Sequence, residues 1–289
     1  MQRYAPLGNV SVITDSVSCL PPEIIQRYHI GIVPLSIISH GKAYRDGVDI
    51  TPTQAYELFS ENPDAFSTSA PSPSEFLNAY KEAGKLSHNI LYISVSAAIS
   101  STHETAILAR EYAKREIPFV SIEILDSESA TTSEGFIAYA AAKAADAGAT
   151  LEEVVRTAHE TKNKVDSYVL LDTVKHVYRS GRVPKMAAQA GSFFNIRALF
   201  EVRAKIHLSA VFRNHERGLD IMFEKIKKQV GDKPVHAAVM HAYAQEAAIK
   251  LKERTAKELN CKELWLTEFS PIMGYACGTG TLGIAFCPI

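Results

Sequence analysis

The sequence has few cysteines, a single tryptophan and no long apolar run. No stretch approaches the roughly 20 apolar residues that a membrane-spanning helix needs, so we expect no stable membrane insertion. The first residues, MQRYAPLGNV, lack the basic segment and apolar run of a secretory signal. The four cysteines form no C-x-x-C pair and lie beside no histidines at metal-ligand spacing. We therefore predict free, mostly buried thiols, no metal site and a cytoplasmic location.

An excess of charge of either sign is also missing. The chain has 31 Lys and Arg against 32 Asp and Glu, a net charge of −1. This balance gives no long-range attraction to nucleic acid or to an anionic membrane surface. What is present, in 289 residues, is 46% hydrophobic and 22% charged residues, a composition typical of soluble globular proteins. The length suggests one large or two ordinary domains with a sizeable core.

Short β-rich runs alternate with helical segments through the first part of the chain. The pattern predicts strands at 9–14, 31–39, 89–96 and 119–126, and helices at 21–28, 51–61, 73–85, 101–115, 131–148 and 150–164. Such β-α repetition is typical of a doubly wound, largely parallel sheet.

The rhythm changes after about residue 164. Here we predict strands at 167–172, in two stretches of 198–212 with a break near Ala204-Lys205, at 234–240, at 263–269 and, as an edge strand, in 279–289. Helices are expected at 219–230, at 244–259 and, as a short helix, within 173–182. The fold class is therefore α/β, with two α/β domains at 1–164 and 165–289 and a cleft between them.

Small hydroxyls gather in FSTSAPSPS, residues 66–74, a predicted loop in which nine residues hold five hydroxyls and two prolines. Ser72 is a predicted helix N-cap, with Pro73 at the first helical position and Glu75 closing a capping box. This leaves Thr68 and Ser69 without a role. A second such segment, SAAISSTHE at 96–104, also precedes a helix. Two helix N-termini rich in hydroxyls could hold an anion, or be two ordinary N-caps.

Two other motifs carry weaker signals. GTGTLG at 278–283 matches the dinucleotide-binding pattern, but too few residues follow it for the helix and strand that the motif requires. We interpret it as a glycine-rich turn. Asp15 follows a predicted strand, where catalytic carboxylates are common in open α/β sheets. No second Asp follows it, so a loop Asp that binds local amides is the alternative interpretation. No G-x-S-x-G elbow occurs.

Several segments, in order along nearly the whole chain, resemble the bacterial DegV family of fatty-acid-binding proteins. VITDSVSCL resembles the family's opening I-x-T-D-S, STSAPSPSEF its T-S-Q-P-S-P signature and ISVSAAISSTHE its I-S-S-x-L-S-G-T-Y-Q segment. YHIGIVPLSI and GKAYRDGVDIT resemble its second strand and the following loop. YRSGR and GYACGTGTLGIAF resemble its G-G-R or S-G-R element and its closing G-A-H-T-G-P-G-x-L-G-x-x-F.

The resemblance implies a DegV-like fold with one long-chain fatty acid, for example of the palmitate to stearate class, bound between the domains. It also implies a carrier without catalytic residues or a cofactor, which presents the carboxylate to the catalytic subunit of a fatty acid kinase for acyl-phosphate formation. The residues implied for lipid binding are Thr68, Ser69, Thr279 and a serine, either Ser96 or Ser100. The residues implied for kinase binding are Arg182 and Arg213.

The sequence departs from the family pattern at two positions of the implied site. Ala276 stands where the family has a carboxylate-binding His, which removes one donor to the head group. Ala97 replaces the second of the paired serines. The alternative function from the residues alone is a small-molecule hydrolase or phosphotransferase with Asp15 in the interdomain cleft. A long apolar cavity favours the carrier, and a short polar pocket with several carboxylates favours the enzyme.

Overall fold

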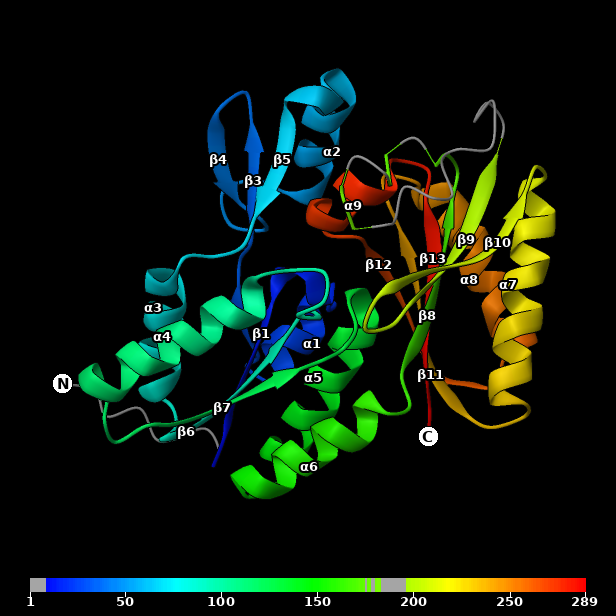
Figure 1. Cartoon of the computed structure of the whole chain (residues 1–289). Coiled ribbons are helices and arrows are strands. Elements are labelled where there is room, and N and C mark those ends of the chain that lie inside the picture. The colour runs from blue at the N-terminus through cyan, green and yellow to red at the C-terminus, as the bar shows by residue number, and fades with distance from the viewer. Residues whose placement is uncertain (1–8, 175, 178–179, 183–195) are drawn as a thin grey trace.

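The computed structural model describes residues 9–174, 176–177, 180–182 and 196–289. Two α/β lobes lie side by side, and the final strand runs through the second of them (Figure 1). Strands of the first lobe fall within residues 11–126 and strands of the second within residues 166–288. One hydrophobic cluster contains residues of both lobes, so the lobes share part of their core. The domain limits at 164 and 165 remain a prediction.

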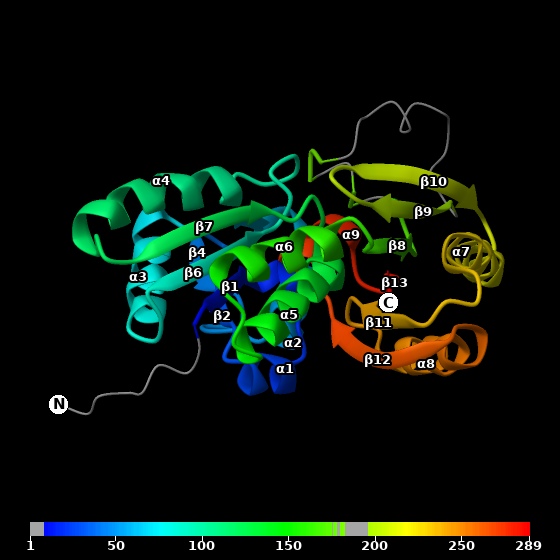
Figure 2. The ribbon, with the colours of Figure 1, turned by 90° about the horizontal axis from the view of Figure 1, so that it is seen from below.

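The first lobe is built on a parallel sheet with helices on both faces. Its strand order is β2-β1-β6-β7, with bounds Gly31–Val33, Ser11–Asp15, Asn89–Ser94 and Ser121–Asp126. Helices α3 (Pro73–Gly84) and α4 (Thr102–Glu116) cover one face, and α5 (Thr131–Asp146) and α6 (Leu151–Lys162) cover the other (Figure 2). Both faces are buried, which accounts for the apolar character of these strands.

A small antiparallel sheet stands above this layer. Its order is β4-β3-β5, with bounds Lys42–Arg45, Ser36–Ser39 and Phe66–Ser69. Helix α2 (Pro52–Glu61) and the short helix η2 (Pro63–Ala65) connect β4 to β5. Two more short helices, η1 (Ser16–Ser18) and α1 (Pro22–Arg27), follow β1. Strand β5, which carries Thr68, lies beside α2 in this upper part of the first lobe (Figure 1).

The second lobe contains a mixed sheet in the order β10-β9-β8-β13-β11-β12. The strands are Ile206–Phe212, Arg197–Val202, Asp166–Leu171, Leu282–Pro288, Val235–His241 and Cys261–Glu268. Helices α7 (His215–Val230) and α8 (Gln245–Glu258) pack on one face, and the other face turns toward the first lobe (Figure 2). Helix α9 (Pro271–Cys277) connects β12 to β13 beside the first lobe.

Four expectations from the sequence need correction. The predicted strand 31–39 is two strands, β2 and β3, in different sheets, because Pro34 interrupts the run and cannot donate to a ladder. The segment 66–69 is a strand and not a loop. The final strand is not at an edge: β13 pairs with both β8 and β11. The short helix predicted within 173–182 is absent from the residues described there, which form turns and bends; residues 175, 178 and 179 lie outside them.

Three other predictions, on the β9–β10 break, the α3 cap and the cysteines, are confirmed. The break near Ala204-Lys205 separates β9 and β10, which pair as an antiparallel hairpin. Ser72 caps α3 in a capping box with Glu75. The four cysteines are free. Among the described residues, none of the helices has the length and apolar character required to cross a bilayer.

Candidate functional site

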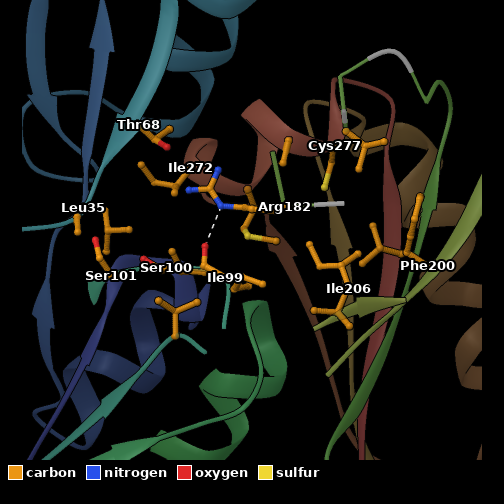
Figure 3. Close-up of a pocket in the computed structure, with 18 of the residues that line it drawn as sticks. Leu35, Thr68, Ile99, Ser100, Ser101, Arg182, Phe200, Ile206, Ile272 and Cys277 are labelled. Carbon is orange, nitrogen blue, oxygen red and sulfur yellow. Dashed lines mark hydrogen bonds between the residues drawn. The ribbon is translucent and has the colours of Figure 1, made fainter. Parts of the chain in front are cut away.

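An apolar cavity of about 330 Å³ lies between the two lobes (Figure 3). This volume is within the range of roughly 300–1,000 Å³ that is usual for small-molecule sites. The first lobe contributes β5 and the segments that follow β1 and β6, and the second lobe contributes residues of β8, β9, β10 and α9. The apolar lining consists of Val17, Leu35, Ala70, Val95, Ile99, Val169, Leu171, Val177, Phe200, Val202, Ile206, Ile272, Met273, Ala276 and Cys277.

Polar side chains of the lining come from three segments. Thr68 and Ser69 lie on β5, Ser100 and Ser101 precede α4, and Arg182 follows β8. Among the described residues that line the cavity, none is acidic and Arg182 is the single cation. The lining is therefore that of a site for an apolar molecule with an acceptor-rich or anionic end.

The Arg182 guanidinium is partly buried and held by backbone carbonyls. Its Nε donates to the carbonyl oxygen of Ile99 at 2.9 Å and its Nη1 to that of Ser180 at 3.4 Å (Figure 3). Burial lowers the pKa of Arg182, but an arginine stays charged throughout the physiological range. A guanidinium has five N–H donors, so donors remain for a ligand. The sequence predicted Arg182 as a partner contact, whereas in the structure its side chain lines the cavity.

Three of the predicted lipid-binding residues line the cavity: Thr68, Ser69 and Ser100. Thr68 is half-buried, and within the described part of the chain its hydroxyl has no hydrogen-bond partner. The Ser100 hydroxyl pairs with Thr102 Oγ1 at 2.8 Å and accepts the Thr102 N–H at 3.3 Å. The Ser72 hydroxyl accepts the Glu75 N–H of the helix cap. The cluster of hydroxyls thus divides into capping groups and groups that face the cavity.

The other predicted residues lie outside the lining described above. Ser96 is buried, and its hydroxyl donates to the carbonyl oxygen of Ala204 at 2.7 Å in the β9–β10 turn. Thr279 lies in the turn between α9 and β13, flanked by Gly278 and Gly280, which both have positive φ. Arg213 is exposed after β10. Of the two candidate serines, Ser100 is therefore the one that faces the cavity.

Helix α9 carries Ala276, the position at which the resemblance implies a carboxylate-binding His. Ala276 is buried and lines the cavity beside Cys277. Burial raises the pKa of the Cys277 thiol to about 12, so the thiol is neutral and acts as apolar lining. Helix α9 is not among the helices expected from the sequence, although Ser270 followed by Pro271 is a typical N-terminal signal.

Asp15 is fully buried and is not among the described residues that line the cavity. Its carboxylate accepts the N–H groups of Val17 and Val95, at 3.0 and 2.9 Å, and the Tyr92 hydroxyl at 3.2 Å. Val17 and Val95 both line the cavity. Burial raises the pKa of Asp15 to about 6 and raises the pKa of neighbouring Glu134 well above its usual range. Asp15 thus holds two segments of the cavity wall in position.

Asp15→Asn should flatten the pH dependence of protein stability. Because the folded pKa of about 6 lies above the ordinary value of 3.8, the folded state binds this proton more tightly than the unfolded state. The stability from Asp15 is therefore fully present below about pH 4 and is lost as the pH rises through about 6. This difference corresponds to about 3 kcal/mol. Urea unfolding measures the free energy of unfolding of both proteins at about pH 4 and pH 7. Between these pH values the free energy of unfolding of the variant should rise, relative to that of the wild type, by an amount of this order. If the stability of the wild type and of the variant depended on pH in the same way, the raised pKa of Asp15 would be contradicted.

The fold and the cavity define a two-lobed α/β protein with an apolar site between its lobes, whose described lining also contains hydroxyls and one cation. The chain belongs to the DegV family, described as a family of uncharacterised proteins, whose sequence profile matches residues 9–288. A DegV domain-containing protein of Clostridium perfringens is 29% identical over 280 residues, covering 96% of this chain and 98% of the relative. Protein DegV of Bacillus subtilis is 26% identical over 282 residues, covering 96% and 99%.

Solved structures of similar proteins have the same fold. DegV of B. subtilis, a fatty acid binding protein, has a TM-score of 0.87 at 26% identity and covers 98% of this chain and 100% of its own. A stearic acid-binding protein of Eubacterium ventriosum has a TM-score of 0.89 at 19% identity, with coverages of 96% and 98%. The predicted family and fold class are confirmed.

Proposed function

We propose that this protein binds one long-chain fatty acid in the cavity between its lobes. The observation that carries the proposal is the lining: an apolar wall from both lobes, without a described carboxylate and with one cation, Arg182. Fatty acid binding by DegV of B. subtilis, which matches over nearly the whole chain, supports it. The carboxylate would lie among Thr68, Ser100 and Arg182, and the chain would extend along β8 and β9.

The tail and the head group of the fatty acid contribute differently to binding. About 15 methylenes gain roughly 0.8 kcal/mol each on burial, or about 12 kcal/mol before the costs of association. The tail therefore sets the affinity. A carboxylate that leaves water without partners costs several kcal/mol, so the hydroxyls and the guanidinium set its orientation.

We further propose that the protein is a carrier without a catalytic step of its own. In the cytoplasm, it would present the carboxylate to the catalytic subunit of a fatty acid kinase, and exposed Arg213 would contact that partner. The carrier role is supported by the lack of acidic groups among the described lining residues. The free cysteines suit a reducing compartment. Asp15, the residue on which the alternative hydrolase or phosphotransferase depends, is buried behind the wall.

Organic extraction of the purified protein, followed by mass spectrometry, tests the proposal directly. We expect a stoichiometric amount of a free long-chain fatty acid. Protein that contains no lipid and also fails to bind a fluorescent fatty acid would refute it.

Thr68→Val should weaken the binding of a free fatty acid by roughly 1–3 kcal/mol, because a buried head group then loses a hydrogen-bond partner. Displacement of a fluorescent fatty acid measures the change. Ser67→Val is the matched control, since Ser67 is an exposed neighbour on the same strand and points to its other side. Equal affinities of wild type and Thr68→Val would remove Thr68 from the site.

A further inference from the structure

The hydroxyl side chains of Thr68 and Ser101 and the ring of Phe200 lie on opposite sides of the cavity. In Figure 3, Thr68, Leu35 and Ser101 lie at one side of the lining and Phe200 at the opposite side. Residues that are far apart in one view are far apart in space, so Phe200 marks the end remote from the hydroxyls. A ligand with its head group near Thr68 therefore directs its tail toward Phe200.

Strand β9 presents Phe200 to the cavity through the normal alternation of a strand. Phe200 and Val202 belong to the core cluster between the lobes, whereas Leu199 belongs to the cluster under α7 and α8. Phe200 is 2% exposed. It is the largest apolar side chain among the described lining residues, and its strand pairs with β8 on one side and β10 on the other.

Phe200 lies on the strand next to the edge of the sheet. Phe200 lies opposite Val169 of β8 and opposite Leu208 of β10. Strand β10 is the outermost strand, and Leu208 is 45% exposed. Directly opposed residues of antiparallel strands point to the same face, so Leu208 continues the row of Val169 and Phe200 outward. Phe200 is thus the last residue of this row that lines the cavity, and Leu208, the next one outward, is outside the described lining.

We propose that Phe200 is the end wall of the cavity and sets the maximum length of the bound acyl chain. The inference rests on the proposed function. Each methylene that enters the cavity raises affinity roughly fourfold, and this gain stops when the terminal methyl group reaches the ring. A longer chain must bend or leave carbon atoms in water, so its affinity levels off or falls.

Phe200→Ala opens the wall and should shift the preference to longer chains. We expect affinity in the wild type to reach a maximum within the series of saturated acids from myristate to behenate. In the variant it should continue to rise, by roughly 15-fold for each two added carbons, beyond that maximum. Phe200→Leu should give a smaller shift in the same direction and serves if the alanine variant does not fold. The fluorescent displacement assay and the acids extracted from the purified proteins supply two independent measurements.

Leu199→Ala is the matched control. It truncates the neighbouring buried residue on the same strand but on the opposite face, so it lowers stability without enlarging the cavity. Its chain-length maximum should equal that of the wild type. If both Phe200 variants still bind fatty acid and their preferred chain length is that of the wild type, Phe200 is not the end wall. The proposed function would then remain intact. Wild-type protein that binds none of these acids would overturn the proposed function itself.

Discussion

Arg182→Met should weaken the binding of a free long-chain fatty acid at neutral pH by roughly 30- to 1,000-fold, or about 2–4 kcal/mol. Methionine keeps an unbranched apolar side chain in the lining but removes the one cation among its described residues. The Thr68 and Ser100 hydroxyls can still donate hydrogen bonds, but they cannot neutralise a carboxylate. The displacement assay with palmitate measures the loss.

The size of this effect has an upper limit, because the ligand can bind in its protonated form. A carboxyl with an ordinary pKa of about 4.3 pays about 4 kcal/mol to be neutral at pH 7 and only about 1 kcal/mol at pH 5. The loss in the Arg182→Met variant should therefore shrink to less than about tenfold near pH 5. Palmitate methyl ester has no charge to lose, so the variant should bind it at least as well as the wild type.

Arg213→Met provides the matched control, because Arg213 is exposed and outside the described lining of the cavity. This variant should retain wild-type affinity for palmitate. Arg182→Lys keeps a positive charge and should recover part of the affinity. If Arg182→Met binds acid and ester equally poorly, the change has damaged the cavity and the guanidinium is not the partner of the carboxylate.

The parts of the fold that the sequence predicts well are those determined by local chemistry. The capping box of Ser72 and Glu75 sets the start of α3, and the interrupted apolar run sets the break between β9 and β10. The short loops of the alternating β-α segments indicate a parallel sheet. In each case the residues that determine the structure are neighbours in the sequence, so the pattern is visible without knowledge of the fold.

The errors arise where the partner of a segment is distant in the sequence. Phe66–Ser69 is short and rich in hydroxyls, and it becomes a strand because β3 offers an open edge for pairing. The final strand lies between β8 and β11, and its nearly continuous apolar run, Leu282 to Phe286, is the signal of burial on both faces that an edge strand lacks.

In the candidate site, too, the features set by neighbouring residues are visible in the sequence and those set by distant residues are not. Hydroxyls before two helices are visible in the sequence, and Thr68, Ser69 and Ser100 meet in one lining. The role of Arg182 is not visible there, because the Ile99 carbonyl that holds its guanidinium is far away in the chain. The apolar wall is also hidden, since alternate residues of β8 and β9 are divided between the cavity and the core under α7 and α8.

Gly274→Ala should destabilise the whole protein, because α9 packs on Tyr56 with no space for a methyl group. A Cβ at Gly274 would lie 2.2 Å from Cε1 and 2.4 Å from the hydroxyl oxygen of Tyr56. Tyr56 cannot move aside easily: it is 1% exposed, and its hydroxyl donates to the Phe269 carbonyl oxygen at 2.9 Å. Overpacking of this kind typically costs about 1–3 kcal/mol, occasionally more. Urea unfolding measures the loss.

The same substitution should also weaken fatty acid binding, since α9 must shift and it carries Ile272, Met273 and Ala276 in the cavity wall. In a Tyr56→Leu background the ring is gone, so adding Gly274→Ala should cost clearly less stability than it does in the wild type. Gly84→Ala, near the end of α3, is the matched control: its Cβ would meet only a Val120 methyl group at 3.1 Å, and alanine favours the helix. An equal cost of Gly274→Ala in both backgrounds would show that contact with Tyr56 is not what keeps glycine at this position.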